Sequence, residues 1–350
     1  NVEQWSRIIK ERAVLRNLIH ASNRIAQSCY EAEDEAAVIL DRAEKAIFDI
    51  GERRIRLGFV GIREVVKESF RTIDQLSQSK ELVTGLPTGF HDFDEMTAGL
   101  QNSDLIILAA RPAMGKTTLA LNMAEYAALK TKKAVAVYSM EMSASQLAFR
   151  LISSIGRINA TRLRTGQLED EDWARVNMAI KMLSEVKIFI DDTPALSPDV
   201  LRSKARRIKR EHDLGLIVID YLQLMAVPGT GENRATEISE ISRSLKALAK
   251  ELNVPVIALS QLNRGLESRT DKRPVMADLR ESGAIEQDAD VIVFIYRDDY
   301  YNKENSPDKG LAEVIIGKQR NGPTGSIKLK FFGEYTRFDN LAHDSVGSFE

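Results

Sequence analysis

Apolar positions in the first part of the chain recur at spacings of three and four, which is the periodicity of amphipathic helices. Two such patterns fill residues 1–54, and the short break between them predicts an antiparallel helical hairpin. Two helices cannot bury both of their apolar faces alone. We therefore expect the hairpin to be the end of a larger N-terminal domain, or to pack against another subunit.

Residues 55–82 have the composition of a linker that contains one amphipathic helix. Its narrow apolar stripe runs from Ile62 to Leu76. An isolated helix of this length is marginal in water, so it needs a surface to pack on. It either docks on a neighbouring subunit or folds back on its own domain, and light scattering on a chain lacking residues 62–80 would separate the two.

From Val83 onward, apolar runs of strand length alternate with helical patterns. The runs lie at 105–109, 134–139, 187–190, 216–220, 254–259, 290–296, 312–317, 326–332 and 335–338. Several are continuously hydrophobic, as expected of strands that are covered on both faces. The alternation predicts an α/β domain over residues 83–350 with a mostly parallel central sheet, which ends in an antiparallel meander.

Composition narrows the classes of protein that this chain could belong to. Lys and Arg number 49 against 51 Asp and Glu, so any nucleic-acid surface must be local. Cys29 is the only cysteine and the four histidines are scattered, which excludes an intrachain disulfide and a cysteine-based zinc site. Without a long apolar segment or a signal peptide, the expected location is the cytoplasm.

The run at 105–109 leads into a candidate phosphate-binding loop and then into a helical pattern. The loop and helix start read Arg111-Pro112-Ala113-Met114-Gly115-Lys116-Thr117-Thr118. In a P-loop, backbone N–H groups surround the phosphates, Lys116 would reach the β/γ oxygens and Thr117 would hold Mg²⁺. Ala110 stands where the usual motif has its first glycine, which is tolerable if φ stays negative there. The alternative is an ordinary turn with a surface lysine.

Polar residues follow three other strands, at the edge where ligands bind in open α/β sheets. Glu141 could deprotonate the water that attacks the γ-phosphate, or could simply enter a helix at the surface. Asp220 ends an apolar strand in the form that holds Mg²⁺ in P-loop enzymes. Gln261 could sense the γ-phosphate through its amide, or serve only as a cap.

Lys318 and Arg320 lie at the tip of a predicted hairpin between two late strands. Their two-residue spacing points both side chains the same way if the strand is extended. They could contact phosphate in cis, contact it across a subunit boundary, or be solvated charges that discourage edge aggregation. The local pattern does not choose among these.

Two stretches have the character of loops that contact a nucleic-acid backbone. Residues 263–285 are long and basic, and residues 228–234 are rich in glycine. Both have few aromatic side chains, so phosphate contact is expected rather than base stacking. The basic helix over 201–212 is interpreted as a solvated face.

The motifs together resemble the bacterial replicative DNA helicases of the DnaB type. The resemblance is carried by Ala-Arg-Pro-Ala-Met-Gly-Lys-Thr (110–117), Ser-Met-Glu-Met-Ser (139–143), Ile-Asp-Tyr-Leu-Gln-Leu-Met (219–225), Ser-Gln-Leu-Asn-Arg (260–264), Asp-Leu-Arg-Glu-Ser-Gly-Ala-Ile-Glu-Gln-Asp-Ala-Asp (278–290) and Gly-Lys-Gln-Arg-Asn-Gly-Pro-Thr-Gly (317–325). These motifs occur in order over nearly the whole chain, and alanine at position 110 is usual in that family.

The resemblance implies a RecA-like motor that forms homohexameric rings and unwinds DNA in the 5′-to-3′ direction. It implies ATP and Mg²⁺ held between subunits, with Lys116, Thr117, Glu141, Asp220 and Gln261 from one subunit and Lys318 and Arg320 from the next. It also implies contact between single-stranded DNA and Arg280, Glu281 and Gly283. The hairpin would end an N-terminal collar domain, and primase and a helicase loader would bind through the N-terminal and linker regions.

Two alternatives to a helicase remain at this point. A recombinase-like ATPase on the same fold would form open filaments, which electron microscopy distinguishes from closed rings. A non-catalytic scaffold would use nucleotide only for assembly. The combination of Glu141, Asp220 and Gln261 argues against a scaffold, because a scaffold needs no acid to activate water.

Overall fold

The computed structural model describes residues 2–31, 61–79, 83–227, 234–279 and 283–341, and positions 36, 38, 39, 42, 43, 46 and 47. The chain separates into two compact units, Asn1–Lys80 and Glu81–Glu350. Among the described residues, no helix combines the length and the hydrophobicity needed to cross a membrane.

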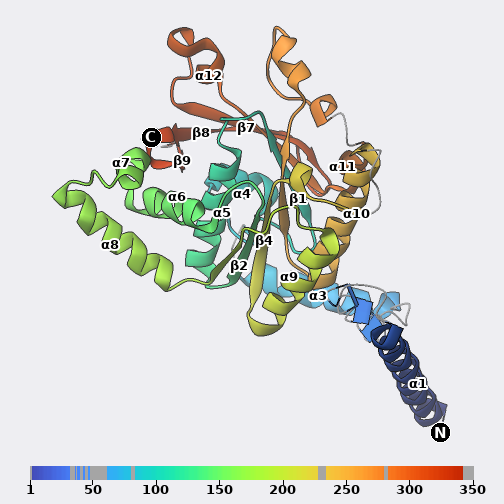
Figure 1. Cartoon of the computed structure of the whole chain (residues 1–350). Coiled ribbons are helices and arrows are strands. Elements are labelled where there is room, and N and C mark those ends of the chain that lie inside the picture. The colour runs from blue at the N-terminus through green and yellow to red at the C-terminus, as the bar shows by residue number, and fades with distance from the viewer. Residues whose placement is uncertain are drawn as a thin grey trace. The chain divides into compact units, whose positions relative to one another are not determined.

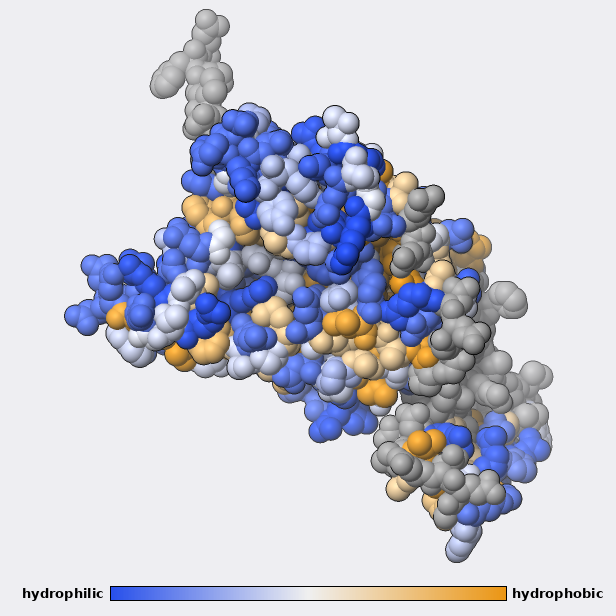
Figure 2. Space-filling view, turned by 45° about the horizontal axis from the view of Figure 1, so that its top comes forward, coloured by the Kyte–Doolittle hydropathy of each residue, from blue (hydrophilic) through white to orange (hydrophobic). Residues whose placement is uncertain are grey.

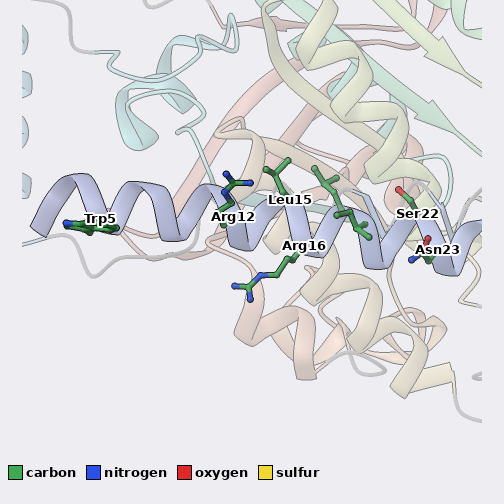
Figure 3. Close-up of a pocket in the computed structure, with 8 residues that line it drawn as sticks. Trp5, Arg12, Leu15, Arg16, Ser22 and Asn23 are labelled. Carbon is green, nitrogen blue, oxygen red and sulfur yellow. The ribbon is translucent and has the colours of Figure 1, made fainter. Parts of the chain in front are cut away.

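Two helices in the described part of the first unit lie at positions that the periodicity predicts. They are α1 (Val2–Glu31) and α3 (Ile62–Ser79). Most of the second half of the predicted hairpin, residues 39–50, lies outside the described residues. Apolar side chains on both helices are exposed, including Trp5 at 65% and Phe70 at 69%. Figure 3 shows Trp5 and Leu15 among the α1 residues that line an open surface cavity.

The second unit is built on one sheet with the order β3-β2-β4-β5-β1-β6-β7-β8-β9. The strands are β1 (Leu105–Ala110), β2 (Ala134–Ser139), β3 (Ile188–Asp191), β4 (Leu214–Asp220), β5 (Val256–Gln261), β6 (Val291–Tyr296), β7 (Leu311–Gln319), β8 (Gly325–Phe332) and β9 (Arg337–Asn340). Strands β1 to β6 are parallel to one another, and β7, β8 and β9 continue from β6 as an antiparallel meander. Each predicted strand is present.

The second unit also contains α-helices and 3₁₀ turns, which alternate with the strands along the chain. The α-helices are α4 (His91–Thr97), α5 (Lys116–Thr131), α6 (Ala144–Gly156), α7 (Ala160–Thr165), α8 (Asp170–Ser184), α9 (Pro198–Glu211), α10 (Arg234–Leu252), α11 (Gly283–Asp288) and α12 (Asp298–Asn302). Single 3₁₀ turns are η1 (Leu222–Leu224), η2 (Arg264–Ser268), η3 (Met276–Leu279), η4 (Lys303–Asn305) and η5 (Gly333–Tyr335).

The sheet has a core on each face because its central strands are apolar at every position. In β1, Ile106 and Leu108 join one cluster, whereas Leu105 and Ile107 join the other. Helices α5 and α6 cover the first face, and α9 and α10 cover the second (Figure 1). On the outer surface, hydrophobic residues appear as separate patches between hydrophilic projections (Figure 2). Because helices cover both faces of the sheet, the central strands are continuously hydrophobic in the sequence.

The interpretation of the basic helix as a solvated face is corrected by the structure of α9. Arg202 and Arg206 both bind the carboxylate of Glu251, the former with Nη2 at 2.5 Å. Lys204 lies 2.6 Å from Asp191. These cations therefore attach α9 to α10 and β3, which the local sequence could not indicate because their partners lie in other elements.

A cluster of charges lies where β1 and β6 begin, at the edge of the sheet opposite the P-loop. Lys246 binds the Asp290 carboxylate and lies 4.0 Å from Asp104. The same Asp290 oxygen accepts the Leu105 N–H at 2.8 Å. Burial, and then repulsion from Asp290, raise the pKa of Asp104 to about 6.

We predict that the stability of Asp104→Asn relative to wild type is greater at pH 7 than at pH 4.5. The folded state binds the Asp104 proton more tightly than the unfolded state, so stability is lost as pH rises from about 4 through 6. The difference in free energy of unfolding between variant and wild type should be greater at pH 7 than at pH 4.5 by roughly 1–3 kcal/mol. Urea unfolding at the two pH values measures it. An equal stability difference at both would contradict the prediction.

Candidate active site

The carboxyl ends of four parallel strands bring the P-loop, Glu141, Asp220 and Gln261 to one edge of the sheet. Ala110 is opposite Gln261 across β1 and β5, and Ser139 is opposite Asp220 across β2 and β4. A cavity of about 310 Å³ opens at this edge. Its lining consists of Ala110, Arg111, Pro112, Ala113, Gly115, Lys116, Thr117, Thr118, Glu141, Met142, Arg150, Gln261, Phe331 and Thr336.

In the loop between β1 and α5, the position that requires glycine is Gly115. Ala110, which stands where the usual motif has its first glycine, has ordinary strand backbone. Ala110 is the last residue of β1 and has no positive φ, whereas Ala113 and Gly115 have φ values of 66° and 95°. A Cβ on Gly115 would lie 2.8 Å from the Phe338 ring. The alanine at 110 is therefore accommodated by ordinary strand backbone, as the sequence argument requires.

Two of the predicted loop residues are held in the protein rather than directed at a ligand. Met114 is 1% exposed and its side chain belongs to the core beneath the loop. Arg111 donates to the Leu262 carbonyl at 2.8 Å and to Glu267 at 2.7 Å. Arg111 thus braces the loop against the residues that follow β5, and the Met114 N–H donates within the loop to the Arg111 carbonyl at 3.4 Å.

Lys116 and Thr117 begin α5 and both contact Asp220. Thr117 Oγ1 donates to Asp220 Oδ2 at 2.7 Å, and Lys116 Nζ lies 3.8 Å from Asp220 Oδ1. The ammonium also lies 4.4 Å from the centre of the Tyr221 ring. Burial lowers the pKa of Lys116, while Asp220 and then Glu141 oppose that shift by favouring its charged form.

Asp220 has the properties expected of a residue that helps to hold a divalent cation. It is 2% exposed, and its Oδ1 atom is buried with no hydrogen-bond partner among the described residues. The Lys116 ammonium, 3.8 Å away, offsets part of the cost of burying this oxygen, and a cation bound to it would offset more. A carboxylate beside a threonine hydroxyl is an oxygen donor set suited to Mg²⁺, so the residues present fit this ion.

Glu141 and Gln261 line the same cavity from different elements. Glu141 is exposed in the turn between β2 and α6, where it acts electrostatically on Lys116. Gln261 is the last residue of β5. An ionisable carboxylate and a neutral amide therefore lie beside the P-loop, one available for proton transfer and the other for hydrogen bonding.

Two arginines were missed by the sequence analysis, one that lines the cavity and one that contacts the lining residues Ala113 and Phe331. Arg150 reaches the cavity from α6, where burial lowers its pKa and the charges of Asp220 and Glu141 oppose that shift. Arg297 lies 4.1 Å from the centre of the Phe331 ring and donates to the Ala113 carbonyl at 3.3 Å. Arg297 directly follows β6, so the rule that ligands lie at strand ends could have found it. No local signal indicates Arg150.

Lys318 and Arg320 lie at the opposite edge of the sheet from this cavity. Strand β7 is antiparallel to β6, and Lys318 is opposite Ile292 near the start of β6. Lys318 Nζ donates to the Ala289 carbonyl at 2.7 Å, and Arg320 Nε lies 3.4 Å from Asp290. Both side chains donate to backbone carbonyls at the end of α11, so they point the same way, as their two-residue spacing predicts. The register excludes contact with the P-loop of the same chain.

The residues expected to contact DNA are only partly described. Arg280 and Glu281 lie outside the described residues, as does the glycine-rich stretch 228–233, whereas Gly283 begins α11. Of the basic residues in the long loop, Arg269 binds Asp278 at 2.9 Å and Arg273 binds Glu313 at 2.8 Å. The first pair lies within the loop, and the second attaches the loop to β7.

Comparison with known proteins places this site in a family. A model of the DnaB-like helicase C terminal domain matches residues 85–340, which include the whole sheet. The chain belongs to the DnaB-like helicase family. The recombinase and scaffold alternatives are therefore set aside, and the resemblance seen in the sequence is confirmed.

Relatives agree with this assignment over most of the chain. The replicative DNA helicase DnaB of Geobacillus stearothermophilus is 53% identical over 342 residues, covering 97% of this chain and 75% of that protein. The Pasteurella multocida protein of the same name is 54% identical over 350 residues, covering 98% and 75%. This DnaB-like chain is accordingly a replicative DNA helicase with ATP-dependent activity.

Solved structures confirm the RecA-like α/β fold of this DnaB-like chain. One solved ATPase domain is 42% identical with a TM-score of 0.77, covering 81% of this chain and 100% of that one. A DnaB-like replicative helicase, described together with its interactions with primase, is 36% identical with a TM-score of 0.83. It covers 97% of this chain and 78% of that one.

Proposed function

We propose that this helicase hydrolyses ATP with Mg²⁺ at the boundary between adjacent subunits of a homohexamer. The observation that carries the proposal is the separation of the P-loop cavity from Lys318 and Arg320, which lie at opposite edges of one sheet. A subunit that presents phosphate-binding groups at one edge and cations at the other is suited to a head-to-tail ring, where each cavity receives cations from its neighbour.

In the proposed site, the first subunit binds the nucleotide and prepares the attacking water. Lys116 and the backbone of the loop bind phosphate oxygens, and Thr117 with Asp220 holds the cation. When bound there, Mg²⁺ would neutralise part of the negative charge that develops on the phosphates during transfer. Glu141 accepts a proton from water, and Gln261 donates hydrogen bonds near the γ-phosphate.

The neighbouring subunit supplies Lys318 and Arg320, which stabilise the negative charge of the transferred phosphoryl group. In the single chain both side chains bind carbonyls near the end of α11. Binding of phosphate would exchange those carbonyl contacts for charge-assisted ones, so hydrolysis would change how adjacent subunits pack. We propose that this change drives translocation along single-stranded DNA in the 5′-to-3′ direction.

We further propose that Arg280, Glu281 and Gly283 contact the DNA backbone. Contact with phosphates rather than bases makes binding insensitive to sequence and weaker at high salt. Residues 1–54 would form the end of a collar domain, residues 55–82 a linker that docks on a neighbour, and residues 83–350 the motor. Primase and a helicase loader would bind through the collar end and the linker. For primase, this proposal is supported by the related DnaB-like helicase that is described together with its interactions with primase. The protein would act in the cytoplasm.

The proposed function is tested by ATP hydrolysis with and without single-stranded DNA, followed by unwinding of forked duplexes that carry a 5′ or a 3′ tail. DNA-stimulated hydrolysis with unwinding that requires the 5′ tail is expected, and Lys116→Ala serves as the inactive reference. Hydrolysis without unwinding would contradict translocation, and activity on the 3′ tail would contradict the direction. Light scattering on the same samples measures whether six subunits assemble.

A further inference from the structure

Gln223 forms a bridge between two strand ends at the floor of the active site. It lies in η1, three residues after Asp220. Its Nε2 donates to Ser260 Oγ at 3.0 Å and to the Gln261 carbonyl at 3.2 Å. Its Oε1 accepts the Gln261 N–H at 3.2 Å. One side-chain amide therefore pairs with both backbone groups of Gln261.

These contacts fix the backbone of a residue that lines the cavity. On its other side, Gln261 is paired in register with Ala110, and the next residue, Leu262, donates to the Ala110 carbonyl at 3.2 Å. Gln261 is thus held between the P-loop strand and Gln223. Because Gln261 is the last residue of β5, its backbone is paired with β1 on one side and with the Gln223 side chain on the other.

Gln223 is itself held from behind by a second set of polar contacts. Its carbonyl accepts from Arg234 Nη2 at 2.6 Å, and Arg234 binds the Glu237 carboxylate. Glu237 Oε1 in turn accepts the Val227 N–H at 3.1 Å. Burial raises the pKa of Glu237, but the Val227 N–H and Arg234 outweigh it, so the pKa lies below its ordinary value. The carboxylate stays charged, and η1 is anchored to the start of α10.

We propose that Gln223 is a positioning residue for ATP hydrolysis, which acts by orienting Gln261 toward the γ-phosphate. The inference rests on the role of Gln261 under the proposed function. Gln223 itself touches Ser260 and the backbone of Gln261, and it is not among the residues that line the cavity. Removing it should therefore impair the chemical step and leave ATP binding by Lys116 and Thr117 unchanged.

The first test is Gln223→Glu, which keeps the size of the side chain. Glutamate still accepts the Gln261 N–H, but it cannot donate to the Gln261 carbonyl and places a carboxylate beside it. A displacement of about 1 Å can cost 10²-fold in rate, so we expect kcat to fall by about 10- to 10²-fold with KM for ATP little changed. Gln167→Glu adds the same charge outside the cavity and should keep wild-type kcat.

The second test asks whether Gln223 acts through Gln261. We expect Gln261→Ala and the double variant Gln223→Glu, Gln261→Ala to have the same kcat, because Gln223 then has no side chain left to orient. Losses that multiply in the double variant would overturn the inference. Gln223→Ala repeats the comparison without the added charge, and thermal unfolding confirms that each variant is folded.

The outcomes separate this inference from the proposed function. If Gln261→Ala lowers kcat and Gln223→Glu does not, the positioning role is wrong and the proposed site stands. If Gln261→Ala leaves kcat unchanged, the role of Gln261 in the proposed site is wrong and the inference is overturned with it. A parallel rise of KM and fall of kcat in Gln223→Glu would indicate general damage to the site and would also overturn the inference.

Discussion

The double variant Lys318→Ala, Arg320→Ala is expected to bind ATP normally and to hydrolyse it about 10³- to 10⁵-fold more slowly, as when arginine fingers are removed from other phosphoryl-transfer enzymes. The expectation follows from the location of these cations. They lie at the far edge of the sheet from their own cavity, so their loss leaves the groups that hold the nucleotide intact. Steady-state hydrolysis and binding of a fluorescent nucleotide measure the two effects.

A matched control for this variant is available on the neighbouring strand. Lys328 and Lys330 are also two residues apart, and Lys328 binds Asp308 at 2.8 Å. Lys328→Ala, Lys330→Ala removes the same amount of charge from the same meander and should retain most of the wild-type rate. Comparable losses in both variants would show that net charge, and not the position of Lys318 and Arg320, is responsible.

Mixing two inactive variants tests whether the cations act across a subunit boundary. Lys116→Ala subunits have intact cations, and Lys318→Ala, Arg320→Ala subunits have an intact P-loop. In a random equal mixture, roughly a quarter of the boundaries combine an intact P-loop with intact cations. Hydrolysis should therefore exceed that of either variant alone. No recovery in assembled mixed rings would contradict action in trans.

Glu141→Gln should lower kcat by about 10²- to 10⁴-fold, the range expected when a general base is lost. The substitution keeps the shape of the side chain but cannot accept a proton. Nucleotide binding should be retained or become tighter, because a negative charge that faces phosphate is removed. Single-turnover hydrolysis and equilibrium binding distinguish these effects.

The control for Glu141→Gln is a glutamate outside the cavity. Glu185 is exposed at the end of α8, and Glu185→Gln should hydrolyse ATP at the wild-type rate. If Glu141→Gln instead keeps a rate within a factor of a few of wild type, another group must activate the water. If it fails to bind nucleotide, the carboxylate has a structural role in the cavity.

Strand positions and the P-loop were predictable because both depend on local patterns. Apolar runs of strand length predicted every strand, and the central ones are continuously hydrophobic because strands covered on both faces leave no polar alternation. The order of strand, loop and helix around Lys116 and Thr117 predicted their place at the edge of the sheet, and strand ends predicted Asp220 and Gln261. In each case the interaction that fixes the residue acts within a few positions along the chain.

The partners of charged and polar side chains could not be predicted in this way. Arg202 and Arg206 bind Glu251 from another helix, and Arg150 reaches the cavity only because α6 returns across the sheet. The bridge from Gln223 to Gln261 joins residues 38 positions apart. Such contacts depend on strand order, which places β4 beside β5, and sequence periodicity carries no information about that order.

Local patterns in the chain were enough to predict the elements, the phosphate-binding loop and the family that the chain resembles. The folded arrangement was needed to show that Met114 is buried, that Arg111 braces the loop, and that Lys318 and Arg320 cannot reach their own cavity. The difference arises because periodicity records which face of an element is apolar. The direction and register of strands depend on long-range packing and backbone pairing. Here β7 runs antiparallel to β6, and this places the two cations at the opposite edge of the sheet.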